Sequence, residues 1–569
     1  MNQPSPAIVP QGAVRRLPRL ALWLFALAYV LPGFIGRTPW RSADITAYGY
    51  MAELAAGRTD WLAPTLGGMP PDVDGLLPYW LGAWALQLAP GWIYPGFAAR
   101  LPFIALLGLA LLAVWYGIYY LARSPLAQPV AFAFGGEAQP RDYARAMADG
   151  GLLAFIASLG LAQLSHETTP AVAQLCFVAL SFYGFAALPY RRWTPALAAL
   201  AGLTGLTLSG GPSLALLLAL GGLLAHALDR TQAREEPGRH RRGFWRLIAL
   251  TALLALLATA LDLWRWRIEL PDSRADLRSL ARLLLWFTWP LWPLVLWTLW
   301  RWRRQLFGHW PSRHLSLPLW YALVTTGAAL ITPASDRALL LALPALATLA
   351  AFALATMNRS VSALIDWFTL LFFTTCALVI WVVWIAMLTG TPPQPAANVA
   401  KLLPTFEPRF IILPFVFATL ATLAWGWLVK WRIGRHRAAL WKSMVLPAGG
   451  AALCWLLLTT LWMPAINHAR SYAPLVERVA DTVQPSTCLA WFGLSRGQLA
   501  GLQMHTTLAL EPLTDSTRCD WAVIDHETQR QTPEIMSASV WERRASLEHP
   551  RPGDEGLVLF RRIEPAAAR

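Results

Sequence analysis

Three of the aspartates in the stretch that follows the first apolar run, residues 20–35, are candidates for chemistry. They are Asp44, Asp72 and Asp74, and each is close to apolar sequence. A carboxylate in such a place can accept the proton of an attacking hydroxyl or amine, or hold a divalent metal ion. A structural alternative exists for Asp44, which could cap a helix over residues 45–56. Spacing alone favours the cap.

A second candidate for substrate contact is the pair His166-Glu167, which falls in a short polar turn between two apolar runs. A plain turn between helices is the simpler interpretation of this pair. The sequence has no Walker loop, no zinc-spaced cluster of Cys and His, and no heptad repeat. The paired glycines at 135–136 and 210–211 are interpreted as hinges or packing positions.

The composition defines the environment in which these side chains act. Of the 569 residues, 56% are hydrophobic and only 14% are charged, whereas soluble proteins carry about 25% charged residues. The 31 tryptophans favour a membrane interface, where both the ring and its N–H are satisfied. The net charge of +15 lies mostly beside the apolar runs, which predicts contact with anionic lipid headgroups and no nucleic-acid partner.

The apolar runs predict about thirteen membrane-spanning helices, because a span needs about 20 apolar residues. The first run is interpreted as an uncleaved helix, since no convincing small-residue cleavage site follows it. Residues 195–228 could instead form one bent hairpin, broken at Gly210-Gly211-Pro212, so the count is defined to within one or two. The expected spans are 18–36, 97–121, 151–165, 171–189, 195–209, 211–228, 244–262, 282–300, 317–332, 338–356, 363–388, 410–429 and 443–463.

The charges of the connecting loops predict an orientation. Arginine and lysine gather in the loops on the side of the N-terminus, and the positive-inside rule places that side in the cytoplasm. The short apolar segment 76–90 is expected to lie on the outer surface as a helix, because a span there would invert the pattern. The outer segments are then 37–96 as one long loop, 166–170, 263–281, 333–337, 389–409 and the tail after 464.

One outer loop breaks this charge pattern. Arg265, Arg267, Arg274 and Arg278 crowd the segment 263–281, which suggests an anionic partner outside the membrane. The alternative is an ordinary solvated loop, because carboxylates lie in and beside the same segment, namely Asp262, Glu269, Asp272 and Asp276. The sequence leaves both interpretations open.

From about residue 464 the sequence becomes polar and mixed, and it predicts a small α/β domain outside the membrane. Cys488 and Cys519 both lie at expected strand starts, and an oxidising compartment makes a disulfide between them plausible. Two unrelated buried thiols are the alternative, since sequence cannot supply their separation. The expected strands are 488–492, 505–510, 520–525 and 556–561, and the expected helix is 472–483.

The order of motifs in the long outer loop resembles that of a known family. Asp44 is followed by Asp60-Trp-Leu-Ala-Pro64 and Gly68-Met-Pro70, and the acidic Asp72-Val-Asp74 then leads into Leu77-Pro-Tyr-Trp-Leu-Gly82. This order resembles the membrane glycosyltransferases of the GT-C fold, in the protein O-mannosyltransferase and aminoarabinose transferase superfamily. Weaker similarities occur at Arg100-Leu-Pro102, Leu208–Pro212, Trp286–Pro293 and Asp336–Pro344.

The resemblance implies a reaction and roles for individual residues. A polyprenyl-phosphate sugar places its lipid among the helices and its phosphate at the outer surface, where an acidic residue activates the acceptor and the anomeric carbon is inverted. Asp44 corresponds to the catalytic aspartate of the family, and Asp74 or Asp72 stands in for a family glutamate. Arg337 is a candidate phosphate contact, because the guanidinium fork matches phosphate oxygens. Arg100 opens the second span as it does in the family.

The sequence also departs from the family pattern. Ile45 stands where a glutamate usually follows the catalytic aspartate, and Gly210 and Asp336 stand where the family has lysines. Several basic phosphate contacts of the family are therefore missing from this chain.

These observations predict an all-α polytopic bundle of the GT-C type over residues 1–463 and a periplasmic α/β domain over 464–569. The expected function is transfer of a sugar from a polyprenyl-phosphate donor to an envelope lipid, glycan or protein, in the bacterial inner membrane with a cytoplasmic N-terminus. A divalent metal is a possible cofactor. A transporter or flippase of lipid-linked substrates and a non-catalytic homologue are the alternatives, and the scarcity of ionisable residues deep in the spans favours the transferase.

Overall fold

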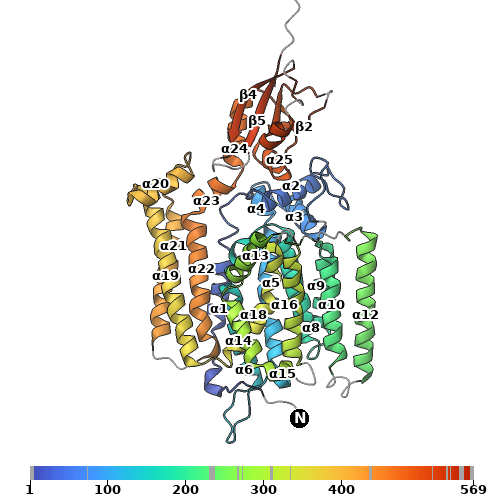
Figure 1. Ribbon diagram of the computed structural model, residues 1–569, viewed down its shortest axis with the longest axis vertical. Helices are drawn as coiled ribbons and strands as arrows, with labels where there is room; N and C mark the ends of the chain where they lie inside the picture. Colours follow the sequence, from blue (N-terminus) through green and yellow to red (C-terminus); the bar gives the residue numbers. More distant parts are fainter. Residues whose placement is uncertain are drawn as a thin grey trace, which may run out of the picture.

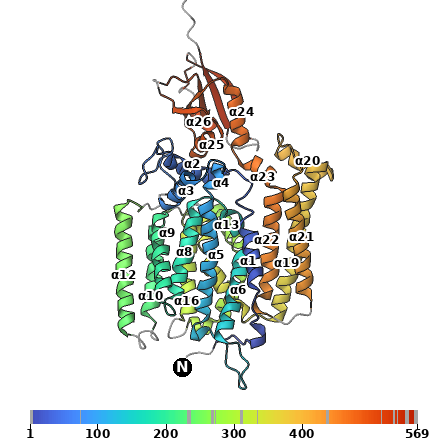
Figure 2. The same ribbon diagram turned by 180° about the vertical axis from the view of Figure 1, so that it is seen from behind.

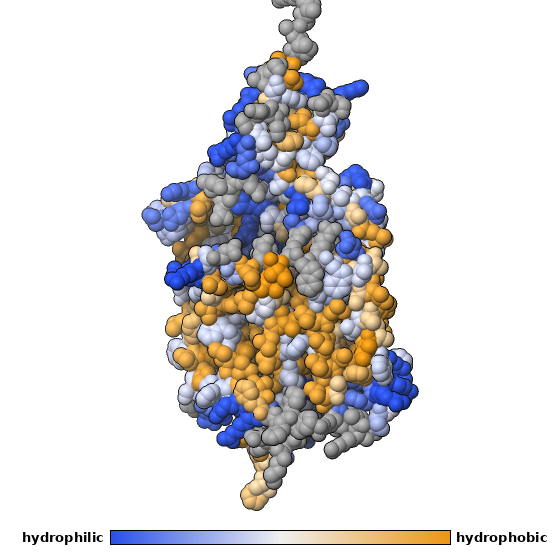
Figure 3. Space-filling view, turned by 45° about the vertical axis from the view of Figure 1, so that its right-hand side comes forward, coloured by the Kyte–Doolittle hydropathy of each residue, from blue (hydrophilic) through white to orange (hydrophobic). Residues whose placement is uncertain are grey.

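Helices dominate this computed structural model, and a small sheet domain stands at one end of the helical bundle (Figure 1). Figure 3 shows, on the face in view, a hydrophobic belt across the middle of the bundle, with hydrophilic surface above and below it. Such a belt is the surface expected of a chain that crosses a bilayer. The structure describes residues 5–73, 75–229, 237–264, 268, 270–271, 273–307, 312–332, 335–434, 439–514, 517–532, 536–537, 540–549 and 556–563.

Every one of the thirteen predicted spans overlaps a helix of the bundle. Within the described residues, six helices are long and apolar enough to cross a membrane, or seven if α13 (Arg274–Phe287) and α14, which meet at 84°, form one span. The protein is therefore a multi-pass membrane protein, and the count of thirteen stays a prediction. The bundle helices are α1 (Arg19–Val30), α5 (Leu101–Ala122), α6 (Pro140–Ala157), α8 (Pro170–Ala187), α9 (Trp193–Leu208), α10 (Pro212–Ala227), α12 (Pro237–Ala260), α14 (Leu291–Arg301), α16 (Arg313–Leu330), α18 (Leu343–Leu354), α19 (Arg359–Thr389), α21 (Ile412–Ile433) and α22 (Val445–Leu461).

Two helix boundaries bear on the predictions. The chain does break between α9 and α10, where Gly210 adopts a positive φ of 83° and Pro212 begins the next helix. The predicted span 151–165 is misplaced, because α6 already begins at Pro140 and ends at Ala157. The charged residues of its first turns, such as Arg141 and Asp142, gave that part of the sequence the character of a loop.

Small residues bring α8 and α9 into close contact. A Cβ atom added to Gly202 would lie 2.4 Å from the backbone nitrogen of Ser181, and one added to Gly184 would lie 2.6 Å from that of Ala199. Neither position therefore accommodates a side chain, as in other close helix pairs within membranes. This packing fixes α8, which begins directly after the polar turn at 166–169.

Three helices of the long outer loop lie between the bundle and the sheet domain (Figures 1 and 2). They are α2 (Ala43–Ala55), α3 (Leu77–Leu88) and α4 (Pro95–Ala98). With 12 residues, α3 is too short to cross a bilayer. It packs beside α2, where Gly82 faces Met51, as expected of a surface helix in the predicted segment 76–90.

The C-terminal region is a five-stranded mixed sheet with helices against it. The strand order is β2-β1-β3-β5-β4, in which β1 is parallel to β2 and β3, whereas β5 is antiparallel to β3 and β4. The fold class predicted from the sequence, a helical membrane bundle with a small C-terminal α/β region, is confirmed. The elements are α23 (Met463–Arg470), α24 (Ala473–Val483), β1 (Cys488–Phe492), α25 (Arg496–His505), β2 (Ala509–Pro512), β3 (Trp521–Asp525), α26 (His526–Gln531), β4 (Trp541–Glu548) and β5 (Gly556–Arg562).

Two predictions in this region need correction. The expected strand 505–510 is mostly wrong, because α25 continues to His505 and β2 begins only at Ala509. The strand β4 was missed, since the charges of Glu542, Arg543 and Arg544 hide its alternating pattern. Cys488 at the start of β1 and Cys519 just before β3 are joined as a disulfide, with their Cα atoms 5.3 Å apart.

The sheet domain is docked on the outer loop through α25 and α2. Gly49 of α2 faces Ala500 of α25, and the Arg496 guanidinium lies 2.6 Å from the Asp72 carboxylate. Gln503 donates a hydrogen bond of 2.9 Å to the Glu53 carboxylate. Residues far apart in the sequence thus hold the loop in place above the bundle.

Candidate functional site

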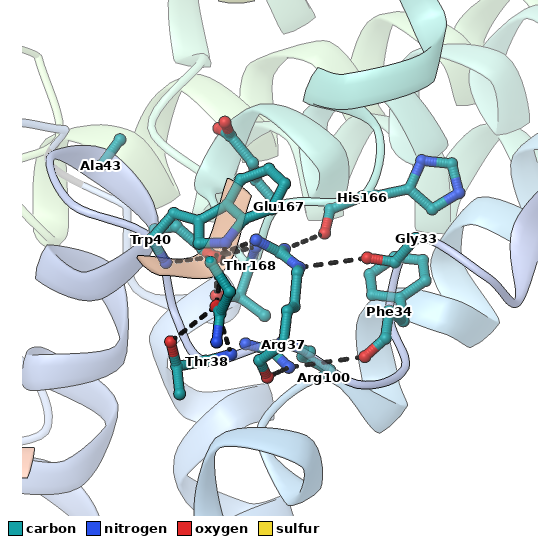
Figure 4. A network of polar contacts seen from close by, with 12 residues as sticks. Gly33, Phe34, Arg37, Thr38, Trp40, Ala43, Arg100, His166, Glu167 and Thr168 are labelled. Atoms are coloured by element: carbon teal, nitrogen blue, oxygen red, sulfur yellow. Dashed lines mark hydrogen bonds and ion pairs between the residues drawn. The ribbon is translucent and has the colours of Figure 1, made fainter. Parts of the chain in front are cut away.

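Asp44 lies in α2, at the end of the bundle that faces the sheet domain (Figure 1), and is the centre of a buried polar network. Figure 4 shows Arg37, Trp40 and Thr168 of this network. Its side chain is 1% exposed. One carboxylate oxygen accepts from Arg37 Nη1 at 2.9 Å and from the backbone N–H of Trp40 at 3.0 Å. The other accepts from the backbone N–H and the hydroxyl of Thr168, at 2.7 and 2.6 Å. Four donors therefore occupy the acceptor positions of this carboxylate.

Asp44 does not cap α2 in the way that the sequence allowed. The N-cap residue is Ser42, whose hydroxyl accepts from the backbone N–H of Ala43 at 2.6 Å. Asp44 instead lies in the first turn of α2, where a negative charge is stabilised by the helix dipole. Its carboxylate connects α2 to the preceding loop and to the turn before α8.

Arg37 supplies the opposite charge in this network. Besides Asp44, its guanidinium donates to the backbone carbonyls of Gly33 and His166, and it stacks 4.3 Å from the ring centre of Trp40. The Arg37 carbonyl in turn accepts from Arg100 Nη1 at 2.6 Å. The Nε and Nη2 atoms of Arg100 are buried and have no hydrogen-bond partner among the described residues.

The turn at 166–168 joins this network to a second ion pair. Glu167, whose neighbour Thr168 binds Asp44, accepts a hydrogen bond of 2.9 Å from Arg337 Nη2. Arg337 lies in α17 (Ser335–Leu340), and its side chain is 25% exposed, whereas that of Glu167 is 6% exposed. The second Arg337 nitrogen, Nη1, lies 3.8 Å from the Asp336 carboxylate. This arginine is therefore the accessible end of the network.

The pKa values of the two buried carboxylates are shifted in opposite directions. Burial alone would raise the pKa of Asp44, but the charges of Arg37 and Arg100 and the hydrogen bonds from Thr168 hold it below its usual value. Burial raises the pKa of Glu167, and Arg337 offsets this only in part, while the charge of Asp44 adds to it. The surroundings of Asp44 thus favour its ionised form, and Glu167 is the group that more readily takes up a proton.

The remaining predicted site residues lie apart from this network or have other partners. His166 is buried among Tyr29, Phe34 and Trp455, and both of its ring nitrogens lie within hydrogen-bond distance of backbone carbonyls, so its geometry is that of a packing residue. Burial lowers its pKa to about 4, which keeps the ring neutral at physiological pH. Asp72 pairs with Arg496 of the sheet domain instead of joining the cluster. Asp74, Arg265 and Arg267 lie outside the described residues.

Two members of the network were not singled out from the sequence. Arg37 follows the first apolar run on the outer side, where the positive-inside rule disfavours a basic residue. This departure from the rule could have marked Arg37 as a site residue. Thr168 gave no such signal, because its role depends on the approach of α2 to the turn before α8.

The donor set of the network does not fit a divalent metal. The Asp44 oxygens are already occupied by four donors, and Glu167 is paired with a guanidinium. Elsewhere in the described part of the chain, the one grouping of three metal-type ligands consists of Cys488, Glu511 and Cys519, whose two thiols form the disulfide. The chemistry considered below therefore uses only side chains of this protein.

The bundle, the outer-loop helices and the terminal sheet domain together have the arrangement of the GT-C fold. The same arrangement occurs in ArnT from Cupriavidus metallidurans, in its crystal structure bound to undecaprenyl phosphate, with a TM-score of 0.58 over 95% of this chain and 98% of that one. Its apo crystal structure gives a TM-score of 0.54 over 95% and 96%. Identity is 14% in both comparisons, so the likeness concerns the fold. No protein-family model and no curated protein sequence matches the chain.

Proposed function

We propose that this protein is a glycosyltransferase that moves a sugar from a polyprenyl-phosphate donor to an envelope acceptor. The reaction takes place at the membrane face that carries the sheet domain. The fold supports this proposal, as does the undecaprenyl phosphate bound to ArnT, which has the same fold. The acceptor is a lipid, a glycan or a protein with a nucleophilic hydroxyl or amine.

The Glu167–Arg337 ion pair carries the proposal. The Arg337 side chain is 25% exposed, so part of its guanidinium is accessible to a phosphate group. A phosphate that binds there competes with Glu167 for the same guanidinium. Binding of the donor would therefore release a carboxylate whose pKa is already raised by burial.

The released carboxylate is suited to act as general base. Glu167 accepts the proton of the acceptor hydroxyl while the acceptor oxygen attacks the anomeric carbon from the side opposite the phosphate. The bond between that carbon and the phosphate oxygen breaks, and the phosphate leaves with the electron pair. Arg337 stabilises the charge that develops on the leaving phosphate. A single displacement of this kind inverts the anomeric carbon.

Asp44 has a positioning role in this mechanism. A carboxylate that accepts from four donors cannot take up a proton without losing one of these hydrogen bonds, whereas Glu167 has a partner that a phosphate can draw away. Asp44 holds the turn at 166–168, and this turn places Glu167 against Arg337. Asp74 remains the alternative base of the outer loop, as the family resemblance implies.

The test is a transfer assay with purified protein and radiolabelled polyprenyl-phosphate sugars. The substitution Glu167→Gln is expected to lower the turnover number about 10²–10⁴-fold, which is the usual contribution of a general base. The exposed outer-loop variant Asp60→Asn is the matched control and should keep full activity. Unchanged activity in Glu167→Gln would exclude this residue as the base. Lipid movement across vesicles without any sugar transfer would instead identify a flippase.

A further inference from the structure

A second polar site lies at the end of the bundle farthest from the sheet domain, where the N-terminal segment and α6 begin (Figures 1 and 2). A hollow of about 320 Å³ opens there. Its lining comes from four separate parts of the chain, namely the segment that leads into α1, the last turns of α5, the helix α6 and the connection from α8 to α9. Its charged lining residues are Arg16, Arg19, Arg123, Arg145, Arg191 and Asp149.

The hollow has a large excess of positive charge. Its single carboxylate, that of Asp149, accepts a hydrogen bond of 2.8 Å from the Trp115 indole. Arg16 pairs with Asp142 at 3.2 Å, outside the lining. Over the part of the chain that the structure describes, none of the other four lining arginines lies within 4 Å of a carboxylate oxygen, and the charge of Arg145 acts at longer range on Asp142 and Asp149. Arg123 stacks 5.0 Å from the ring centre of Tyr190 instead.

Membrane orientation alone does not account for this arrangement. The positive-inside rule requires basic residues in the loops of one face, and it does not require that they converge. Here four distant segments bring arginines to one concave place. Aromatic rings form part of its wall, with Trp115 and Tyr119 stacked at 5.5 Å and Tyr116 44% exposed. A concave site with several convergent charges is characteristic of ligand binding.

The surroundings indicate that the ligand is a lipid. Arg19 and Leu22 of α1 line the hollow. Their neighbours along the helix, Leu20, Trp23 and Leu24, are exposed apolar residues. Within a bilayer such side chains contact acyl chains. A ligand that occupies the hollow can therefore have its phosphate among the arginines and its chains against α1.

We propose that this hollow binds the phosphate headgroup of an anionic glycerophospholipid, on the membrane face opposite the transferase site. The site is independent of the proposed reaction, because none of its residues belongs to the network around Asp44. Bidentate contacts from guanidinium groups to phosphate oxygens provide the recognition. Basic pockets between membrane helices commonly bind such headgroups.

Native mass spectrometry of the detergent-solubilised protein with phosphatidylglycerol tests this proposal. The wild type should retain this lipid in preference to phosphatidylcholine. The double variant Arg145→Gln/Arg191→Gln should weaken the retention about 25-fold, since each basic residue near a membrane surface contributes a factor of about five. The matched control, Arg301→Gln/Arg304→Gln, removes the same charge from exposed positions outside the hollow and should retain the lipid.

Further variants distinguish the other outcomes. Arg145→Lys/Arg191→Lys keeps the charge, and restored retention would show that loss in the glutamine variant is not due to misfolding. Equal retention in the glutamine variant and the wild type would overturn the proposal. Displacement of the lipid by inorganic phosphate at millimolar concentration would overturn it in favour of a soluble anion. Stronger retention of a polyprenyl phosphate than of phosphatidylglycerol would overturn it in favour of a second site for that lipid.

Discussion

Asp44 and Glu167 are two carboxylates of one network with opposite surroundings. Asp44 receives four hydrogen bonds and the charge of a buried arginine, whereas Glu167 has one partly exposed arginine as its partner. The first arrangement stabilises the ionised form and fixes the backbone around it. The second leaves a carboxylate that a ligand can release by binding its partner. Similar residue types therefore have different functions because their partners differ.

Replacing Asp44→Asn should destabilise the protein strongly. An amide presents an N–H₂ group to at least one of the four donors, and it leaves the Arg37 charge buried without a counter-ion. The loss of one partner of a buried ion pair typically costs about 3–5 kcal/mol. Thermal unfolding of the purified protein measures this change, with Asp60→Asn as the control that should unfold like the wild type. Wild-type stability in Asp44→Asn would contradict the anchoring role.

The same residue makes stability depend on acid. The pKa of Asp44 is lowered in the folded protein, so its contribution to stability is present above the unfolded-state pKa. This contribution is lost as the pH falls through the lowered value. Unfolding followed from neutral to acid pH should therefore show a steep loss of stability in the wild type. The loss should be shallower in Asp44→Asn, which has no carboxyl group at this position.

The pH dependence of transfer tests the role of Glu167. A base must be ionised, so kcat/KM should rise with pH along a limb whose midpoint lies above the ordinary glutamate pKa of 4.5, because burial raises that pKa. Arg337 partly lowers the same pKa, so Arg337→Gln should move the limb to higher pH and also weaken donor binding. A limb that stays in place in Arg337→Gln would argue against Glu167 as the titrating group.

At the scale of elements, the position of the site depends on the outer loop held under the sheet domain. The contacts between α2 and α25 include Gly49 against Ala500 and the Glu53–Gln503 hydrogen bond. Cys488 precedes α25 in the sequence and Cys519 follows it. Their disulfide joins the start of β1 to the residues just before the adjacent strand β3. The stability of the small domain therefore bears on the geometry of α2.

Removal of this disulfide should loosen the sheet domain. The double variant Cys488→Ser/Cys519→Ser frees a loop with a sequence separation of 31 residues, which corresponds to roughly 3–4 kcal/mol of stability on the chain-entropy scale. Limited proteolysis should then cleave the region after residue 470 faster than in the wild type, while the bundle stays intact. The variant Cys176→Ser serves as control, because this buried cysteine of α8 is free. Equal cleavage rates in all three proteins would contradict the stabilising role.

The sequence predicted elements better than it predicted contacts. Hydrophobic runs located helices at all thirteen expected spans, and the segment 76–90 was recognised as the surface helix α3 because a span there would have inverted the charge pattern. The start of α6 was missed because charged residues occupy its first turns, and β4 was missed for the same reason. Periodicity reports which residues avoid water, and charged residues inside an element remove that signal.

The candidate site shows the same limit at finer scale. Asp44, Glu167 and Arg337 were each identified as candidates, and the family resemblance assigned Asp44 and Arg337 to one reaction. The sequence did not indicate that the turn at 166–168 connects them. The roles of Arg37 and Thr168 could not be predicted, because they depend on three-dimensional contacts between the first outer loop and the turn before α8. The four hydrogen bonds to Asp44 could not be seen from the sequence for the same reason, so there was no ground in the sequence for choosing Glu167 over Asp44 as the base.

At the scale of the whole molecule, the two sites lie at opposite ends of one bundle. The network around Asp44 faces the sheet domain, and the arginine-lined hollow lies at the other end (Figures 1 and 2). Several of the most basic connections, such as that containing α15 (Arg303–Leu306), are also at the end away from the sheet domain. The charge asymmetry of the sequence therefore coincides with the asymmetry of the fold, and it predicts that the hollow faces the cytoplasm.

Site-directed labelling of introduced cysteines tests this orientation. In a background with Cys176, Cys376 and Cys454 replaced by serine, Glu527→Cys of α26 should react with a membrane-impermeant maleimide in spheroplasts, whereas Arg304→Cys of α15 should react only in inverted vesicles. Both positions are exposed, so access to the reagent depends on the side of the membrane. The reverse result would place Glu167 and Arg337 in the cytosol. The proposed transfer to an envelope acceptor would then fail, because the acceptor would lie across the bilayer from the base and the phosphate contact.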